Sequence, residues 1–582
     1  MVSIHCTFNL LFASTTMTTK PMSRKEWYKV APIVTLMIML SASATWAQNL
    51  PSSADPSRIE PFASSPVPTQ PPSKIIVPEA QSTPQIPENA KDITFTLTQL
   101  DIHGATLFSS KQLKKLYQSY VNKEIPLSHL WKIAEQITQL YQQKGYFLCR
   151  AYVPAQEIDD GKVTLEVVEG SITEVTIEDS ALTEYTLVDA LIERLKQQKP
   201  ISAYQLESFM LQMNALPGVE FRAFVEPAQG KEAGMTRLSL RPTTKKGTGS
   251  VSVDNFGSRF LGPYQTTATY HDSFIPLQQT TLSAMSSIPS DELRFIAFRH
   301  ATPIYPDWQI ELAGHYVDAT PGASLAPNDI QSNALELGIG ISWQPIRQRQ
   351  ENLTTSLELT GQNSNGDIFG DNPLTRDRIR AARLFLHYDT ADAWSGYNYL
   401  SLTVNQGISI LGANAQQDSH LSRAEADPTF TSMQFNYMRQ QAMMSEFMAI
   451  SQFASQIASG SLYAAEEFGF GGQAFGRAYD PSEMTGDHGV AASFELRYLG
   501  FAPQQDITFA PYGFYDIGKV WNEEAGGIDE LGMSAGFGLR LDHPTGLAGN
   551  LGLAWPLDHA ISNPIYGNGK NPRLLMQMSY GF

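Results

Sequence analysis

Residues 247–582 of this 582-residue chain are dominated by apolar and polar positions that alternate with a period of two. The pattern is clear over Trp308–Tyr316, Phe494–Tyr498 and Met533–Leu541, and about sixteen such segments follow one another. Successive side chains of a strand point to opposite faces, so each segment predicts a strand with one apolar face. An even number of strands without a long helical pattern between them predicts an antiparallel sheet.

The faces opposite the apolar rows carry small and polar residues, whereas the outer faces of a soluble β-sandwich are richer in charge. We therefore predict a transmembrane antiparallel β-barrel of about sixteen strands over residues 247–582, with lipid outside and a polar lumen. The apolar face of the last strand includes Met578, Tyr580 and Phe582. A terminal strand ending in an aromatic residue resembles the assembly signal of bacterial outer-membrane barrels. The resemblance implies that Tyr580 and Phe582 direct the chain to the barrel-assembly machinery and to outer-membrane lipid.

The region before the barrel mixes strand and helix patterns. Phe95–Ile102 alternates as a half-buried strand does, with one phase slip at Gln99. Two helical stripes with i, i+3, i+4 and i+7 spacing follow, and then two short strands. Residues 93–170 are thus predicted to form a strand–helix–helix–strand–strand module, and residues 171–243 a second small α/β module.

Short motifs in the first module suggest its relatives. Gly145–Tyr146, Arg150–Gln156 and Val168–Gly170 resemble the POTRA domain of bacterial two-partner secretion transporters, and residues 171–243 resemble a second copy. The resemblance implies periplasmic modules that bind an exported protein, and extended substrates are often bound by strand addition at a sheet edge. We expect cargo recognition at four residues: Tyr146, Arg150, Tyr152 and Gln156. A pair of soluble α/β modules with unrelated partners is the alternative.

The N-terminal region is typical of an export signal followed by a linker. A basic stretch precedes the apolar run Val30–Leu40, and small residues follow up to Ala47. We expect residues 1–47 to be a signal peptide cleaved after Ala47 or Ala44. A membrane anchor is the alternative, although the run is short for a bilayer. Residues 48–92 are rich in Pro, Ser, Ala and Gln, which predicts an extended linker.

Composition argues against several classes of function. Charged residues make up 17% of the chain, the net charge is −17, and no dense Lys/Arg cluster occurs, which argues against nucleic-acid binding. The nucleotide-binding pattern G-x-x-x-x-G-K-[ST] is missing, and we expect no hydrolase nucleophile elbow. Cys6 and Cys149 form no metal-ligating cluster with histidine. We therefore expect no enzymatic activity, no metal and no cofactor, and an apolar, buried environment for Cys149.

A glycine-rich stretch, Phe468–Asp480, lies between the eleventh and twelfth predicted strands. Together with Phe514–Gly518 it resembles the signature of the ShlB/FhaC/HecB type of two-partner secretion transporter. In that family an Arg-Gly-Tyr/Phe loop tip folds back into the barrel lumen and meets an acidic residue of the wall. The resemblance implies that Arg477 and Tyr479 form the tip and that Asp516 is the partner.

Elementary physics supports this pairing. Asp516 alternates with the apolar Tyr515 and Ile517, so its carboxylate is predicted to face the lumen, where an arginine needs a partner because an unpaired buried charge is costly. Ala478 stands where the family has glycine. Three loop glycines allow a close approach to the wall: Gly471, Gly472 and Gly476.

These features predict an outer-membrane transporter with its POTRA domains in the periplasm. It would export a large secreted protein of haemolysin, adhesin or toxin type without nucleotide hydrolysis. A barrel-assembly insertase of the same superfamily is the alternative, although such proteins usually carry more POTRA units. A surface enzyme on a barrel and a passive porin are weaker alternatives. Family members often have an N-terminal plug helix, but residues 48–90 show no helical period, so we expect the plug to be absent or degenerate.

Overall fold

The computed structural model describes residues 50–59, 75–76, 86–179, 182, 185–228, 234–289, 291–444, 446–504, 507–523, 529–558, 560–561, 564 and 567–582. The predicted signal peptide, residues 1–47, lies outside them. Among the described residues, no helix has both the length and the apolar character needed to cross a membrane.

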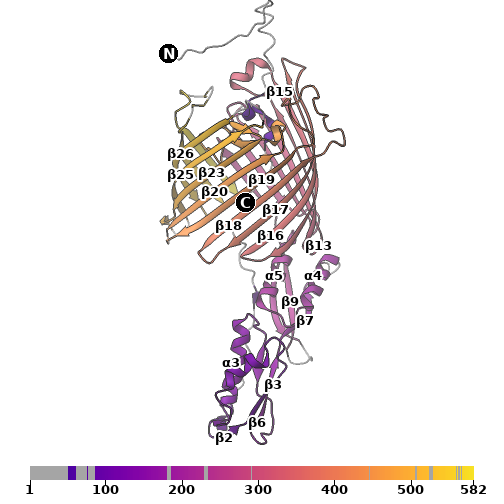
Figure 1. The fold of residues 1–582 in the computed structure, drawn as a ribbon, viewed down its shortest axis with the longest axis vertical. Coiled ribbons are helices and arrows are strands. Elements are labelled where there is room, and N and C mark those ends of the chain that lie inside the picture. Colours follow the sequence, from indigo (N-terminus) through magenta and orange to yellow (C-terminus); the bar gives the residue numbers. More distant parts are fainter. Residues whose placement is uncertain are drawn as a thin grey trace, which may run out of the picture. The chain divides into compact units, whose positions relative to one another are not determined.

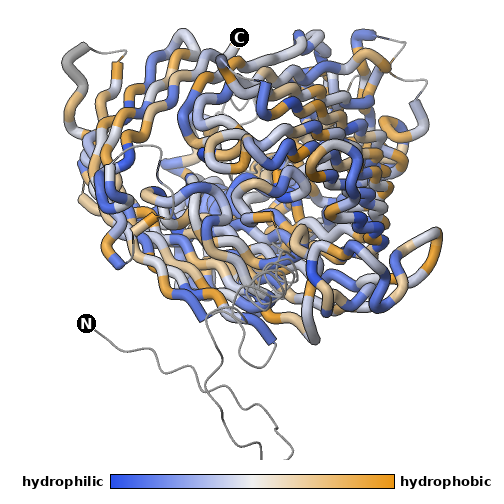
Figure 2. The backbone as a smooth tube through the Cα atoms, turned by 90° about the horizontal axis from the view of Figure 1, so that it is seen from above, coloured by the Kyte–Doolittle hydropathy of each residue, from blue (hydrophilic) through white to orange (hydrophobic). Residues whose placement is uncertain are grey.

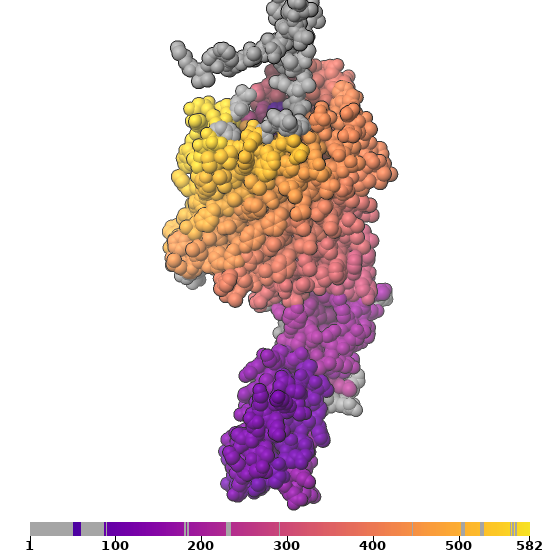
Figure 3. Space-filling view, in the orientation of Figure 1, coloured from indigo at the N-terminus to yellow at the C-terminus, as the bar shows by residue number. Residues whose placement is uncertain are grey.

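A closed antiparallel barrel forms the C-terminal part of the chain, which confirms the predicted fold class (Figure 1). In the part that the structure describes, sixteen long strands follow one another around the ring, and the short β24 (Phe501–Gln504) pairs with β25. On the face visible in Figure 3 the strands pack side by side without a break. The sixteen strands are β10 (Thr248–Asp254), β11 (Gln265–Asp272), β12 (Gln279–Ser287), β13 (Leu293–Tyr305), β14 (Trp308–Ala319), β15 (Gln331–Arg347), β16 (Glu351–Ile368), β17 (Asn372–Ala391), β18 (Gly396–Gly407), β19 (Thr431–Met443), β20 (Phe447–Ala458), β23 (His488–Tyr498), β25 (Ile507–Trp521), β26 (Asp529–Asp542), β27 (Leu547–Pro556) and β28 (Arg573–Gly581).

The barrel strands separate an apolar outer face from a polar inner face. Ile339, Leu359 and Phe537 are each more than half exposed on the outside, whereas Gln362 and Ser493 are buried inside. Seen from above, hydrophobic and hydrophilic positions alternate along the strands, and the ring encloses further segments of chain (Figure 2). This arrangement is the one that lipid outside and a polar lumen require.

The ring closes where β28 pairs with β10. At the end of this seam the backbone groups of Gly249 and Phe582 exchange two hydrogen bonds, each 2.9 Å long. Tyr580 and Phe582 are about half exposed or more, at 48% and 62%. The terminal residue therefore forms the last rung of the closing pair of strands.

The first module contains β2 (Thr94–Leu97), β3 (Gln99–His103), α2 (Ser110–Tyr117), β4 (Lys123–Pro126), α3 (His129–Gln143), β5 (Arg150–Tyr152) and β6 (Lys162–Val168). The single strand predicted over Phe95–Ile102 is wrong. Leu97 and Leu100 are both buried, so the side-chain phase changes between them and the chain forms two strands. β2 pairs with β4, which the sequence patterns did not reveal, and β3, β6 and β5 form a separate sheet.

The second module contains β7 (Ser171–Ile177), α4 (Thr186–Lys196), α5 (Ala203–Asn214), β8 (Val219–Pro227) and β9 (Met235–Thr244). Its sheet has the order β1-β8-β9-β7, in which the two-residue β1 (Ile75–Ile76) pairs in parallel with β8. Arg194 of α4 forms an ion pair of 2.5 Å with Asp307, in the turn between β13 and β14. The second module thus contacts the barrel at that turn.

Part of the predicted linker is not an extended chain. Within residues 48–92, two single turns of 3-10 helix, Ser52–Ala54 and Pro56–Arg58, are largely buried inside the barrel. The backbone carbonyl of Ser57 accepts a hydrogen bond of 3.3 Å from the Gln362 side chain of β16. Small side chains and a wall of polar groups make this burial possible, because the wall satisfies the backbone that the short turns leave unpaired.

Candidate functional site

A long loop, residues 459–487, connects β20 to β23 and folds into the barrel. It contains the 3-10 turn Ala464–Glu466 and a small hairpin of β21 (Phe468–Phe470) and β22 (Met484–Gly486). The loop and the adjoining wall share a core that includes Phe470, Tyr479 and Met484. The loop is thus a packed element of the lumen.

Arg477 at the loop tip is buried against two wall strands, β23 and β25. Its backbone N–H and its Nε donate to Oδ2 of Asp516 at 3.0 and 3.1 Å, and its Nη2 donates to Oδ1 at 2.8 Å. Nη2 also donates to Ser493 at 3.0 Å, Nη1 bonds Glu495, and the guanidinium lies 3.5 Å from the ring centroid of Phe514. All three guanidinium nitrogens and one face of the cation are therefore engaged.

Asp516 on β25 is completely buried and is held by more than the arginine. The hydroxyls of Ser493 on β23 and Ser534 on β26 donate to its two oxygens at 2.8 and 3.0 Å. Side chains of the two strands on either side of β25 therefore hold the carboxylate in addition to the loop. Ser534 lies within a G-x-S-x-G pattern, but that pattern is in the middle of β26, not at the strand-to-helix turn of a nucleophile elbow.

Tyr479 packs on the other side of the loop tip. It is fully buried, its hydroxyl donates to the Met533 carbonyl at 3.1 Å, and its own carbonyl accepts from Arg573 at 2.6 Å. Ala478 is fully buried and lies outside the left-handed region, so the turn does not require glycine at this position.

Three glycines supply the unusual backbone of the tip. Gly471, Gly472 and Gly476 have φ values of +122°, +98° and +71°. A Cβ on Gly476 would lie 2.6 Å from the Phe470 ring, and one on Gly471 would lie 2.1 Å from the Asp480 carbonyl oxygen. Both conformation and space therefore demand glycine at these two positions.

A second clamp, which the sequence analysis missed, holds the tip from the opposite direction. Arg259, in the β10–β11 loop, donates to Asp480 at 2.7 Å and to Glu483 at 2.6 Å, and all three side chains are at least nine-tenths buried. Arg573 on β28 reaches Asp480 at 3.0 Å. The loop tip is therefore tied to β28 and to the loop that follows β10, the two strands that close the barrel.

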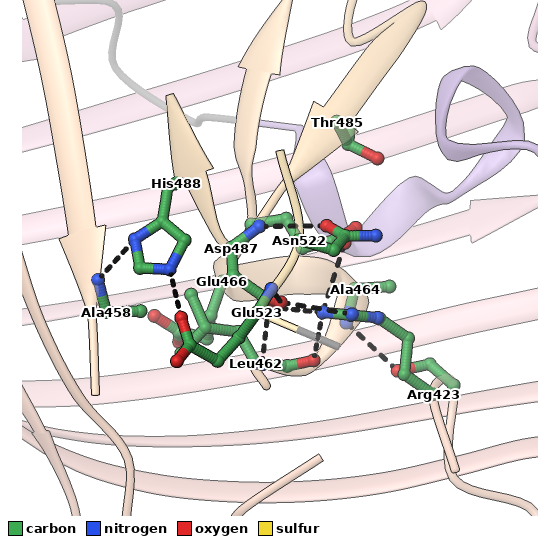
Figure 4. Close-up of polar contacts among 12 residues, drawn as sticks. Arg423, Ala458, Leu462, Ala464, Glu466, Thr485, Asp487, His488, Asn522 and Glu523 are labelled. Atoms are coloured by element: carbon green, nitrogen blue, oxygen red, sulfur yellow. Dashed lines mark hydrogen bonds and ion pairs between the residues drawn. The ribbon is translucent and has the colours of Figure 1, made fainter. Parts of the chain in front are cut away.

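A third clamp lies at the base of the loop (Figure 4). Arg423, from the β18–β19 loop, bonds the fully buried Asp487, and Arg383 on β17 bonds Glu466 with contacts of 2.6 and 3.0 Å. His488 accepts from the backbone N–H of Ala458 and lies 2.8 Å from Glu523. The only sequence signal for these pairs was the set of acidic residues in a glycine-rich loop; nothing marked their distant arginine partners.

The N-terminal segment meets the same base. Arg58 donates to the carbonyls of Ala464 and Glu467, the latter at 2.9 Å, and its guanidinium lies 3.7 Å from the Glu467 carboxylate. Ser52 bonds Thr485 at 2.8 Å, and Figure 4 shows Thr485 beside this segment. Residues 51–59 therefore occupy part of the barrel lumen.

The four predicted recognition residues have different environments. Arg150 is exposed on β5, Tyr152 is half-buried, and Tyr146 packs against the module core. The Gln156 amide exchanges two 2.7 Å hydrogen bonds with the backbone of Thr164 on β6. The N–H of Ala151 donates to Thr138 of α3 at 2.9 Å, so β5 is not a fully open edge for another strand.

Comparison with known proteins matches this architecture. The POTRA domain model of ShlB type matches residues 95–170, and the model of the haemolysin secretion/activation protein ShlB/FhaC/HecB matches residues 234–541. The chain belongs to the ShlB/FhaC/HecB family. It is therefore an outer-membrane secretion transporter, with its POTRA module in the periplasm and its barrel in the membrane.

Individual relatives are distant in sequence and match more than two thirds of the chain. The heme/hemopexin transporter protein HuxB of Haemophilus influenzae is 23% identical over 84% of this chain and 89% of its own length. The outer membrane transporter CdiB of Dickeya dadantii is 22% identical over 69% of this chain and 72% of its own length. The structure of CdiB from Escherichia coli aligns with a TM-score of 0.66 at 17% identity, covering 97% of this chain and all of the other.

Membership fixes the orientation of the barrel. The turn at Asp307, which contacts the second module, marks the periplasmic end, and the loop 459–487 joins its strands at the extracellular end. No cluster of His, Cys, Asp and Glu that could hold a metal occurs among the described residues.

Proposed function

We propose that this transporter exports one large secreted partner protein, and that the loop tip at Arg477 keeps the lumen in the arrangement from which export starts. The observation that carries this is the contact of Arg477 with Asp516, a buried carboxylate positioned by three strands. Because the strands position this carboxylate, the loop tip has one defined binding position in the lumen. Removal of the loop tip would open space along β23, β25 and β26.

Capture of the partner is assigned to the POTRA modules. Exposed Arg150 and half-buried Tyr152 remain candidates for direct contact, while Gln156 acts on the module itself by pairing with Thr164. A second surface is the outer edge of β8, where the two-residue strand Ile75–Ile76 pairs in parallel and leaves the rest of the edge uncovered by it. A sheet edge that accepts one extended segment can accept another by backbone hydrogen bonding.

We assign no chemical step to this protein. The charged lumenal groups described above pair with one another: Asp516 with Arg477, Asp487 with Arg423, and Glu466 with Arg383. Folding of the partner outside the cell would supply the driving force in the absence of nucleotide hydrolysis. If the protein were an insertase, its partners would instead be the substrates of the barrel-assembly machinery.

The test is co-expression with a very large secreted protein, sought first among the genes that neighbour the gene of this transporter. Secretion per assembled barrel should fall at least about tenfold when residues 93–170 are deleted or Arg150 and Tyr152 are both replaced by alanine. An insertase would show the opposite pattern, with normal secretion and loss of other outer-membrane proteins. That outcome would contradict the proposed secretion function and support the insertase function instead.

A further inference from the structure

Three arginines form a regular row on the outside of the barrel. Arg376, Arg378 and Arg380 occupy alternate positions at the extracellular end of β17. Their neighbours on the other face, Asp377 and Ile379, are buried, at 4% and 3% exposure. Strand alternation therefore places the three arginines on the face that continues downward to the lipid-facing Leu384 and Leu386.

The three guanidiniums share one set of contacts, and Arg380 alone has a further one, from its Nε to the Leu411 carbonyl at 3.1 Å. In each, Nη1 donates to a backbone carbonyl of β16 and to the carbonyl of the residue before it, while Nη2 donates to the next outward side chain of β16. The β16 carbonyls are Gly366, Ser364 and Gln362, and the side chains are Asp367, Asn365 and Asn363. Because the same contacts recur at every second residue of the strand, the three guanidiniums form a fixed row roughly 14 Å long.

The row carries uncompensated positive charge. Arg376 is paired with Asp367, but the contacts of the described residues give Arg378 and Arg380 only amide and carbonyl oxygens as partners. Arg378 uses three of its five guanidinium N–H groups in these contacts. An arginine facing lipid is tolerated near the interface and is costly at the bilayer centre. The row therefore lies where the apolar belt ends and headgroups begin.

We propose that this row binds the phosphate groups of the anionic glycolipid that forms the outer leaflet, of the lipid A type. The charge and the position of the row identify this partner. Among the described residues, two fixed guanidiniums have no carboxylate partner, and they lie on the outer face at the level of the extracellular headgroups. Guanidinium groups bind phosphate through paired, charge-assisted hydrogen bonds, and positioned arginines lose little freedom on binding. The exposed Leu384 and Leu386 below the row would contact the acyl chains.

The experiment uses the full chain in detergent and native mass spectrometry with bisphosphorylated lipid A, dephosphorylated lipid A and phosphatidylglycerol as probes. The variant is Arg378→Gln with Arg380→Gln, which keeps Arg376 on Asp367. The matched control is Arg294→Gln, an outward arginine at the extracellular end of β13 that has its own partner, Asp291, at 3.0 Å. We expect the double variant to retain bisphosphorylated lipid A about tenfold less than the wild type, and the control to match the wild type.

Several results would overturn the proposal. One is equal retention by the double variant, and another is an equal loss in Arg294→Gln. Equal retention of dephosphorylated lipid A or phosphatidylglycerol by the wild type would show that phosphorylated glycolipid is not selected. Displacement of bound lipid A by millimolar inorganic phosphate would assign the row to small ions. If the double variant fails to assemble, the wild-type comparison of phosphorylated and dephosphorylated lipid A decides alone.

Discussion

Arg477 and Asp516 are joined by three hydrogen bonds of 2.8 to 3.1 Å, one of which comes from the backbone of the arginine. The side chain and the main chain of the loop tip therefore bind the same carboxylate. Because both the backbone and the side chain of Arg477 are held, the tip has a fixed position and its positive charge is paired.

Arg477→Ala should assemble normally but secrete poorly. Loss of the cation leaves Asp516 without a positive partner among the described residues, whereas Glu495 keeps Arg497 and Arg540. This should cost about 3–5 kcal/mol of the free energy that holds the loop in place, while the strand hydrogen bonds are untouched. Arg477→Lys should recover part of the secretion, because an ammonium cannot form the planar two-point contact. Asp516→Asn should resemble Arg477→Ala. The measurement is partner secretion divided by barrel level in the outer membrane.

The matched control is Arg497→Ala, which removes another arginine of Glu495 without touching the loop. It should secrete nearly as the wild type does. Exchange of charges in an Arg477→Asp, Asp516→Arg double variant should fail to rescue, since Ser493 and Ser534 are set to donate to a carboxylate. Wild-type secretion by Arg477→Ala would refute the role given to this contact.

Gly476 and Ala478 should respond in opposite ways to substitution. Gly476→Ala places a Cβ in the left-handed region, at a cost of roughly 1–2 kcal/mol, and presses it against Phe470. Ala478→Gly only removes a methyl group from an ordinary conformation, at a cost of about 1 kcal/mol. Protease cleavage within residues 459–487 of assembled barrels should rise in the first variant and stay low in the second. Equal cleavage in both would mean that the tip conformation is not what protects the loop.

The sequence revealed the inward-facing wall residue but only one of the arginine contacts around the loop. Strand parity at Tyr515 and Ile517 was enough to predict a lumenal Asp516. Arg259, Arg383 and Arg423 come from other loops and strands, and no local pattern links them to the acidic residues they bind. Gln156 illustrates the same limit: its identity suggested a recognition role, yet its amide pairs with β6, a contact set by tertiary structure.

Phe582 allows the assembly signal to be separated from barrel closure. Deletion of Phe582 removes both backbone hydrogen bonds to Gly249, whereas Phe582→Ala keeps them and removes only the ring. If the aromatic ring is the signal, both variants should lower the amount of heat-modifiable barrel. Phe537→Ala, at a lipid-facing ring of similar exposure, should have little effect. Normal assembly of Phe582→Ala beside a defective deletion would assign the effect to closure alone.

Glu169 should make the first module sensitive to acid. Burial raises the pKa of Glu169, but hydrogen bonds from Thr106, Tyr141 and the backbone outweigh it, so the pKa lies below its ordinary 4.5. A lowered folded-state pKa gives stability that is present above pH 4.5 and is lost as the pH falls through the folded value. Glu169→Gln should be less stable at pH 7 and should show a weaker dependence on pH.

The buried thiol of Cys149 reports unfolding of this module in the full chain. Burial raises its pKa to about 11, so the folded module should resist labelling. Pulse labelling with dithiodipyridine along a denaturant series, at pH 7 and below pH 4, measures the transition. Glu135→Gln, at an exposed position of α3, is the control. A wild-type midpoint that does not change with pH would contradict the role of Glu169.

Arg58 should determine whether the N-terminal segment, residues 51–59, blocks the barrel lumen. Its contacts with Ala464 and Glu467 hold residues 51–59 inside the barrel, and its side chain is only 8% exposed. Arg58→Ala should release the segment without unfolding the loop, because Glu467 keeps Arg423 at 3.2 Å. Conductance of single barrels in planar bilayers should rise several-fold, and deletion of residues 51–59 should give the same value. Arg58→Lys should fall between, since a lysine can reach one carbonyl but cannot span two. If the deletion leaves conductance unchanged, the inward-folded loop alone closes the pore, and the segment occupies the lumen without limiting passage through it.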